Sequence, residues 1–248
     1  MNRVLEHPLA DNEAALWWLG QAGYIIRSAG VTVVMDPYLT DSAAGPKGNF
    51  ARLFPPPLAP EELVADLFII THDHGDHLDP ETIARVDKKT TFIAPRHTAR
   101  RLRELGVPEV SVVEAGDEWQ HGPLSVRGVF ALPTGADVLD TTGYLLTFAN
   151  GRSVYHTSDT AFHPLVLAAA PREPEVMLVP INGKWGNPNP EQAVELTAAV
   201  RPRFVLPNHY DLMALNAENP ETFRWLCESR ALSAKCHSAR RMEAFCWH

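Results

Sequence analysis

The segment that most constrains this chain is residues 70–80, which places many metal-binding side chains directly after an apolar run. The segment reads ITHDHGDHLDP and contains three histidines and three aspartates. Residues 67–70 are all apolar, which is typical of a strand buried on both faces. A simple turn does not need so many imidazoles, so the pattern predicts a metal site at the end of a buried strand.

The spacing within this segment indicates how its side chains converge. His72 and His74 are two residues apart, so in an extended chain both imidazoles face the same way. Asp76 and His77 follow across Gly75, which permits a sharp bend. Histidine and aspartate are preferred ligands of borderline divalent metals such as zinc. These four groups can begin two adjoining half-sites, but further ligands must come from distant segments.

Two such ligands are expected at the ends of other apolar strands. Asp159 follows a predicted strand over residues 153–156, and His209 follows one over residues 204–206. Sites in sheet proteins of this class lie at the carboxyl ends of strands. The two oxygens of Asp159 can bridge two cations, and a neutral His209 would close a half-site. Turn formation or capping is the alternative interpretation of each residue taken alone.

The remaining histidines and the cysteines show weaker patterns. We interpret His156 either as an orienting residue of the site or as a core histidine, and His163 lies within reach of Asp159. The other histidines considered are expected to be surface or structural residues: His7, His97 and His121. The cysteines fit no compact four-ligand zinc pattern and are expected to be idle thiols: Cys227, Cys236 and Cys246.

The order of predicted elements favours an α/β fold in one domain over residues 1–248, with more antiparallel pairing than a doubly wound sheet has. No linker forces a second domain. Asp79 is expected to cap a helix that begins at Pro80. Further helices are expected over residues 95–105, 164–170, 190–200 and 220–229. Strands are expected over residues 15–19, 24–27, 31–35, 67–71, 91–94, 110–113, 124–132, 144–148, 153–156, 176–179 and 204–206.

Charge and hydropathy narrow the expected partners. The formal net charge is −8 and there is no basic stripe, which argues against nucleic acid as a partner. A small molecule is expected instead, and it can be anionic because a bound divalent cation reverses the local charge. No apolar run approaches membrane-spanning length, and no signal peptide is recognisable. We therefore expect a cytoplasmic protein without membrane association, and a homo-oligomer remains open.

Residues 71–77 carry the His-x-His-x-Asp-His signature, which resembles that of the metallo-β-lactamase superfamily. Residues 18–23 and 34–38 resemble its opening strands and Asp-Pro turn, residues 155–160 its bridging-aspartate motif, and residues 206–211 its final histidine motif. The resemblance implies a four-layer αββα sandwich with the site along one edge. Within the superfamily the chain is most similar to the L-ascorbate-6-phosphate lactonase-like branch, on the residues before Asp159 and on Asp211.

The resemblance implies one or two divalent metal ions, zinc or manganese, and six ligands: His72, His74, Asp76, His77, Asp159 and His209. One position departs from the family pattern, because residues 133–137 contain no histidine where the family usually supplies one. Asp137 or water would fill that place, with His163 as a less favoured substitute. A single metal held by Asp76, His77, Asp159 and His209 is the alternative.

Such a site predicts hydrolysis, because a bound metal lowers the pKa of water towards ~7 and polarises a carbonyl or phosphoryl oxygen. Asp76 would orient the water or accept its proton. The expected substrate is a small anionic lactone or ester, including a sugar-phosphate lactone. Lys184 and Trp185 are expected to contact it, although a surface charge and core packing are their alternatives. A phosphodiesterase or nuclease and a non-catalytic metal-binding protein are the alternative functions.

Overall fold

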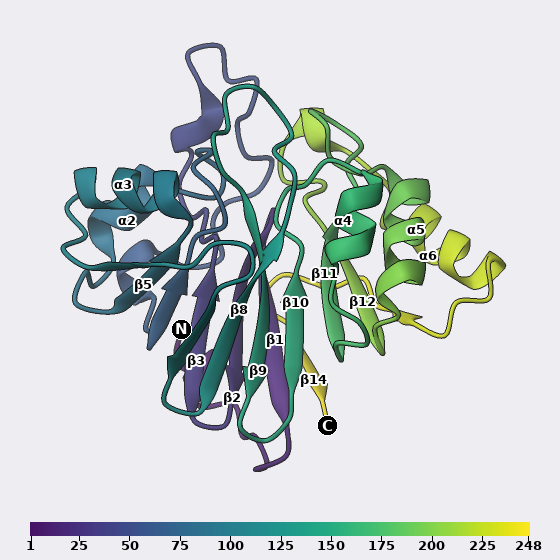
Figure 1. The fold of residues 1–248 in the computed structure, drawn as a ribbon. Coiled ribbons are helices and arrows are strands. Elements are labelled where there is room, and N and C mark those ends of the chain that lie inside the picture. The colour runs from purple at the N-terminus through teal and green to yellow at the C-terminus, as the bar shows by residue number, and fades with distance from the viewer.

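The computed structural model describes residues 1–248 and is built on two seven-stranded sheets (Figure 1). The first sheet has the order β14-β1-β2-β3-β4-β5-β6 and the second β13-β12-β11-β10-β9-β8-β7. Helices α2 and α3 lie on one side of the molecule, and α4, α5 and α6 lie on the other (Figure 1). This arrangement confirms the predicted αββα sandwich.

The bounds of the elements agree closely with the sequence-based expectations. The strands of the first sheet are β1 (Ala14–Gly20), β2 (Gly23–Ser28), β3 (Val31–Met35), β4 (Leu67–Ile69), β5 (Thr91–Ala94), β6 (Val110–Val112) and β14 (Ala244–Trp247). Those of the second are β7 (Glu118–His121), β8 (Leu124–Phe130), β9 (Thr142–Phe148), β10 (Ser153–His156), β11 (Val176–Pro180), β12 (Phe204–Asn208) and β13 (Lys235–Cys236). The helices are α1 (Asn2–Leu5), α2 (Pro80–Arg85), α3 (Arg96–Glu104), α4 (Pro164–Ala169), α5 (Pro190–Val200) and α6 (Pro220–Ser229), with short 3-10 turns η1 (Ser42–Ala44), η2 (Pro60–Glu62) and η3 (Ala214–Asn216).

Both sheets change from antiparallel to parallel pairing along their strand order. In the first sheet β1, β2 and β3 form antiparallel hairpins, and β3 to β6 then run parallel. In the second sheet β7 to β10 are antiparallel, and β10 to β13 are parallel. The parallel strands β4, β10 and β12 therefore end at loops that can share one edge of the sandwich.

The core lies between the two sheets and beneath the helices. A cluster of 39 buried residues includes Leu16 and Ile26 of the first sheet together with Leu146 and Leu178 of the second. A second cluster of 20 buried residues joins the outer face of the first sheet to α2 and α3, with Phe68 stacked on Phe92. None of the helices combines the length and the apolar character needed to cross a bilayer.

The start of α2 shows the capping signal that the sequence predicts, whereas some short edge strands have no signal in the sequence. Asp79 caps α2 by accepting a hydrogen bond from the backbone N–H of Glu81 at 3.1 Å, which confirms its predicted role. The short strands β7, β13 and β14 were not expected. All three are edge strands with partly exposed side chains, so none shows a continuous apolar run. β14 nevertheless pairs with β1 and completes the first sheet.

Candidate metal centre

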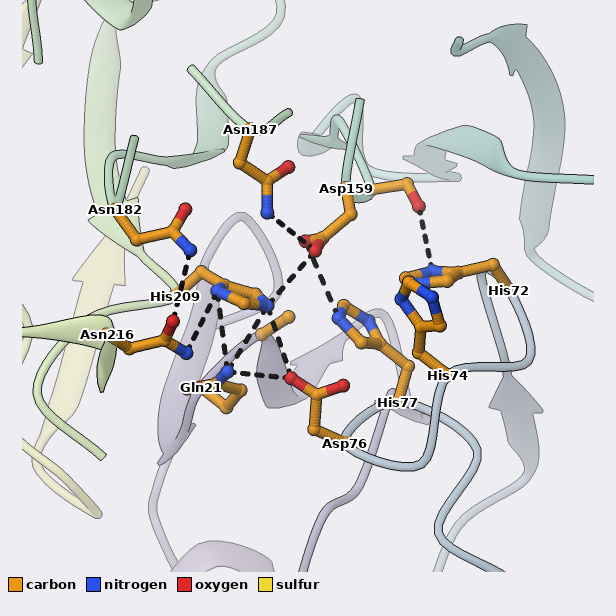
Figure 2. Close-up of polar contacts among 12 residues, drawn as sticks. Gln21, His72, His74, Asp76, His77, Asp159, Asn182, Asn187, His209 and Asn216 are labelled. Atoms are coloured by element: carbon orange, nitrogen blue, oxygen red, sulfur yellow. Dashed lines mark hydrogen bonds and ion pairs between the residues drawn. The ribbon is translucent and has the colours of Figure 1, made fainter. Parts of the chain in front are cut away.

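Three loops bring the predicted metal ligands together at one edge of the sandwich (Figure 2). The loop after β4 carries four of them, the loop after β10 carries Asp159, and the residue after β12 is His209. All six lie in one cluster: His72, His74, Asp76, His77, Asp159 and His209. His209 has a φ of 59° and Ser158, next to Asp159, a φ of 61°. Left-handed backbone at non-glycine residues is uncommon and gathers at functional sites.

His72 and His74 face each other in the first half of the cluster. Nε2 of His72 lies 3.1 Å from Nδ1 of His74. The opposite ring nitrogens have other partners, because Nδ1 of His72 lies 3.1 Å from Oγ1 of Thr71, and Nε2 of His74 lies 3.3 Å from Oδ2 of Asp137. The two facing nitrogens therefore offer a pair of lone pairs to one cation.

The second half of the cluster joins Asp76, His77, Asp159 and His209. Nε2 of His209 lies 3.3 Å from Oδ2 of Asp76 and 3.1 Å from Oδ2 of Asp159. Nε2 of His77 lies 3.5 Å from Oδ1 of Asp159. Ligand atoms of Asp76, His77 and His209 lie within 4.8 Å of one another, as do those of His72, His77 and Asp159. A carboxylate oxygen of Asp159 thus lies within 4.8 Å of a ring nitrogen of His72 in the first half and of His77 in the second, and its bridging role stays a prediction.

Two buried atoms of this cluster show that its residues fit a cation. Nε2 of His77 and Oδ1 of Asp159 are buried and face each other at 3.5 Å, but neither makes a hydrogen bond to the other or to any further group. An unpaired polar atom excluded from water is costly, and native proteins rarely leave one unsatisfied. Imidazole nitrogen and carboxylate oxygen are the donor set that zinc and manganese accept. The residues present therefore suit a divalent metal.

Asp36 orients His77 and was not predicted as part of the site. Its Oδ2 lies 2.8 Å from Nδ1 of His77, and both side chains are fully buried. The same carboxylate accepts hydrogen bonds from the backbone N–H of Thr71 at 2.8 Å and from its hydroxyl at 2.7 Å. An ionised acceptor at Nδ1 leaves the Nε2 lone pair of His77 directed at the cluster. The Asp-Pro pair after β3 was the sequence signal for this residue.

Two buried side-chain amides donate hydrogen bonds to the carboxylates of Asp76 and Asp159. Neither amide was predicted from the sequence to be part of the site. Nε2 of Gln21 donates to Oδ2 of Asp76 at 2.7 Å, and Nδ2 of Asn187 donates to Oδ2 of Asp159 at 2.6 Å. Gln21 reaches the site because the pairing of β1 with β2 shifts register after Trp18, and Gln21 itself has a φ of 51°. Such irregularities are common beside active sites. Neither amide stands in a pattern that signals metal chemistry.

The charges within the cluster perturb its pKa values strongly. Burial alone would raise the pKa of Asp76 and of Asp159, but the neighbouring histidines outweigh it and hold both below their usual range. Burial would lower the pKa of His209, but Asp159 and Asp76 raise it to about 9. Burial and the charge of His77 lower the pKa of His72 to about 3. The positive charge of the neighbouring histidines therefore keeps both carboxylates ionised.

A cavity of about 370 Å³ opens beside the cluster. Its wall includes the rings of Phe50 and Trp185, whose centroids lie 5.4 Å apart. Of the two predicted substrate-contacting residues, Trp185 lines the cavity. Lys184 is exposed and does not line it. The complete lining is Ala43, Phe50, His74, Gly75, Asp76, Thr134, Gly135, Asp137, Asp159, Trp185, Asn187, His209, Met213 and Asn216.

The histidines outside the six predicted ligands make contacts that shape loops and helix ends. Nε2 of His156 lies 2.9 Å from the carbonyl oxygen of Ala22, and its Nδ1 accepts from the N–H of Ser158 at 3.0 Å. It is therefore a core histidine that shapes the loop before Asp159. His163 caps α4 through the N–H of Leu165, so the structure gives it a cap in place of the suggested ligand role. His97 pairs with Asp73 of the metal-binding loop at 3.1 Å.

Comparison with known proteins connects this geometry to a family. Residues 31–210 match the profile described as "Beta-lactamase superfamily domain". A UPF0173 metal-dependent hydrolase of Archaeoglobus fulgidus is 28% identical over 228 residues, which cover 88% of this chain and 92% of that protein. One from Cupriavidus taiwanensis is 30% identical over 238 residues, which cover 87% of this chain and 80% of that protein.

Solved structures show the same fold. Igni18, described as a novel metallo hydrolase from Ignicoccus hospitalis, superposes with a TM-score of 0.77 at 24% identity and covers 95% of this chain and 99% of its own. An isothiocyanate hydrolase from Delia radicum gut bacteria gives a TM-score of 0.77 at 18% identity, with coverages of 93% and 98%. At these identities the similarity concerns the fold.

Proposed function

The chain belongs to the β-lactamase superfamily as a metal-dependent hydrolase, and we propose that it cleaves a small anionic lactone or ester. The observation that carries this proposal is the convergence of Asp76, His77, Asp159 and His209 beside a cavity of about 370 Å³. The lactonase-like resemblance of the sequence supports the choice of a C–O bond.

The residues that would hold the metal are the six of the cluster. His72 and His74 would serve the first half-site, Asp76, His77 and His209 the second, and Asp159 both. A bound divalent cation supplies Lewis acidity and makes water a nucleophile near neutral pH. Zinc and manganese both suit this mixture of imidazole and carboxylate, and one or two ions fit the two half-sites.

We assign the transfer of the proton to Asp76. Gln21 and His209 contact its Oδ2, which leaves Oδ1 free of protein hydrogen bonds. The side chain is 18% exposed and lines the cavity, whereas Asp159 is 7% exposed. In hydrolysis the water oxygen adds to the acyl carbon, the C–O bond breaks and the leaving oxygen takes up a proton. Asp76 can accept the proton of the water and return it to that oxygen.

The cavity supports a compact substrate with an apolar part. Phe50 and Trp185 form an aromatic wall that can cover a ring or an alkyl group. No lysine or arginine lines the cavity, so a negative group of the substrate would be attracted chiefly by the cation. Lys184, which precedes Trp185 in the sequence but does not line the cavity, stays a predicted anion contact.

A substrate panel tests this proposal against its alternatives. The zinc-loaded and manganese-loaded chain should hydrolyse carboxylic esters or lactones and show no turnover of phosphodiesters. His77→Ala should lose the activity, while Asp87→Asn, an exposed aspartate outside the site, should retain it. Hydrolysis of phosphodiesters alone would favour the nuclease, and no turnover across the whole panel would favour a non-catalytic metal-binding protein. Full activity of His77→Ala would overturn the proposed site.

A further inference from the structure

We propose that Asp137 is a positioning residue that acts through His74 and does not ligate a cation itself, an inference that rests on the metal centre of the proposed function. Asp137 stands in the segment where the sequence lacks the histidine usual in the family, and either Asp137 or water was expected as the ligand there. Its Oδ2 lies 3.3 Å from Nε2 of His74, the ring nitrogen that faces away from His72.

The different partners of the two ring nitrogens of His74 support this assignment. Nδ1 of His74 faces Nε2 of His72 at 3.1 Å, so these two atoms would hold a cation in the first half-site. A neutral imidazole carries its proton on one nitrogen and ligates through the other. With the carboxylate of Asp137 at Nε2, the proton is held there and the Nδ1 lone pair is directed at the half-site.

The second half-site contains the same relationship with the ring reversed. Nδ1 of His77 contacts Oδ2 of Asp36 at 2.8 Å, and its Nε2 is the buried atom without a partner. Each half-site thus has one histidine whose outer nitrogen meets an aspartate. The two carboxylates differ in exposure, because Asp36 is fully buried and Asp137 is 78% exposed. Solvent screening makes the contact of Asp137 the weaker one.

The loop that carries Asp137 is anchored on both sides, which keeps this exposed carboxylate in place. The N–H of Leu132 donates to Oγ1 of Thr160 at 2.9 Å. Asp140 accepts a hydrogen bond from the hydroxyl of Thr98 at 3.0 Å and one from the N–H of His97, at the start of α3. Thr141 contacts Ser158 through hydroxyl oxygens 2.7 Å apart.

Helix α3 connects this loop to the metal-binding loop. His97, whose N–H meets Asp140, contacts Oδ2 of Asp73 at 3.1 Å through its ring. Asp73 lies between His72 and His74 in the sequence. The start of α3 therefore holds both the loop of Asp137 and the loop of His74, which fixes their separation.

Nuclear magnetic resonance of the full-length, zinc-loaded chain with ¹⁵N-labelled histidine tests the assignment. We expect the metal on Nδ1 of His74 and a proton on Nε2 that is protected from exchange with water. In Asp137→Ala that proton should exchange rapidly while Nδ1 stays the ligand. Zinc affinity, measured by chelator competition, should fall by about tenfold at most, because an exposed carboxylate contributes less than a buried one. Asp137→Asn retains an acceptor oxygen and should preserve much of the protection. Asp87→Asn is the control for the lost charge and should change neither readout.

Two results would overturn the inference. The first is zinc bound to Nε2 of His74. The second is unchanged protection of the Nε2 proton in Asp137→Ala, which together with weaker zinc binding would make Asp137 a direct ligand. None of these measurements requires turnover, so a failed substrate panel would leave the inference standing.

Discussion

Oδ2 of Asp36 lies 2.8 Å from Nδ1 of His77, and neither side chain is exposed to solvent. The carboxylate also receives both the backbone N–H and the hydroxyl of Thr71. Through these contacts the end of β3 fixes the first residues of the metal-binding loop and the direction of a ligand ring. A residue from outside the histidine motif thus determines how the motif is presented.

Asp36→Asn should weaken metal binding and destabilise the fold. The amide replaces an ionised acceptor and turns a donor towards at least one of three donor groups. We expect zinc affinity to fall about 10–100-fold and the free energy of unfolding of the metal-free chain to fall by about 1–3 kcal/mol. Chelator competition and denaturant titration measure these effects, with Asp87→Asn as the control. Unchanged values in both assays would show that the contact does not orient His77.

Gln21→Met should lower kcat more than it raises KM. Gln21 is fully buried and donates to Oδ2 of Asp76, so its loss frees the carboxylate that handles the proton. A hydrogen bond to a charged group is worth about 1.5–3 kcal/mol, which corresponds to about 10–100-fold in rate. Steady-state kinetics on the best ester of the panel measure this. A rise in KM with kcat unchanged would assign Gln21 to substrate binding instead.

Trp185→Ala should raise KM for substrates with a ring or a long alkyl group. The indole lines the cavity, and its removal takes away apolar contact in the bound state. We expect about a tenfold rise in KM and little change for a short-chain ester. Equal effects on both substrates would instead indicate a general disturbance of the loop.

Lys184→Ala, at the neighbouring residue, tests the predicted anion contact. Because Lys184 is exposed, solvent screens its charge and the effect should be small, about two- to threefold in KM. The increase should be confined to negatively charged esters and should shrink at high salt. An equal change for neutral esters would remove the electrostatic explanation.

The buried side chain of His156 should make the stability of the folded chain depend on pH. Burial lowers its pKa in the folded chain, where both ring nitrogens take part in hydrogen bonds. The neutral ring thus contributes stability that is present above the unfolded pKa of ~6.5 and is lost as the pH falls through the folded value. The Tm of the metal-free chain should therefore drop on acidification below pH ~6.5. His156→Gln should start from a lower Tm and show a shallower drop, and parallel curves would contradict the assignment.

The sequence predicts most of this fold because its strands carry strong local signals. Residues 91–94, 153–156, 190–200 and 220–229 are elements at the predicted positions, since apolar runs there are bounded by proline or by polar residues. β7 and β14 escape such reasoning because edge strands are short and half exposed. Their pairing is decided by the neighbouring strand and not by their own composition.

The candidate site also contains residues that the sequence predicts and residues that it does not. The six predicted ligands lie together as expected, because ligand chemistry restricts candidates to histidine and aspartate after strands. Gln21, Asp36 and Asn187 act through contacts between segments far apart in the chain, and an amide or an Asp-Pro turn has many other uses. Only the folded geometry shows that Asp137 meets Nε2 of His74 and that His163 caps a helix.

Metal content with stoichiometry tests the central claim most directly. The chain purified without chelator should contain one or two divalent ions per molecule, and Asp159→Asn should lose most of that metal because Asp159 lies within 4.8 Å of ligand atoms of His72 and His77 and also pairs with His209. His209→Ala should lose only the ion of the second half-site, and Asp87→Asn should lose none. A wild-type chain that neither contains nor takes up divalent metal, or an Asp159→Asn variant with full metal content, would contradict the account.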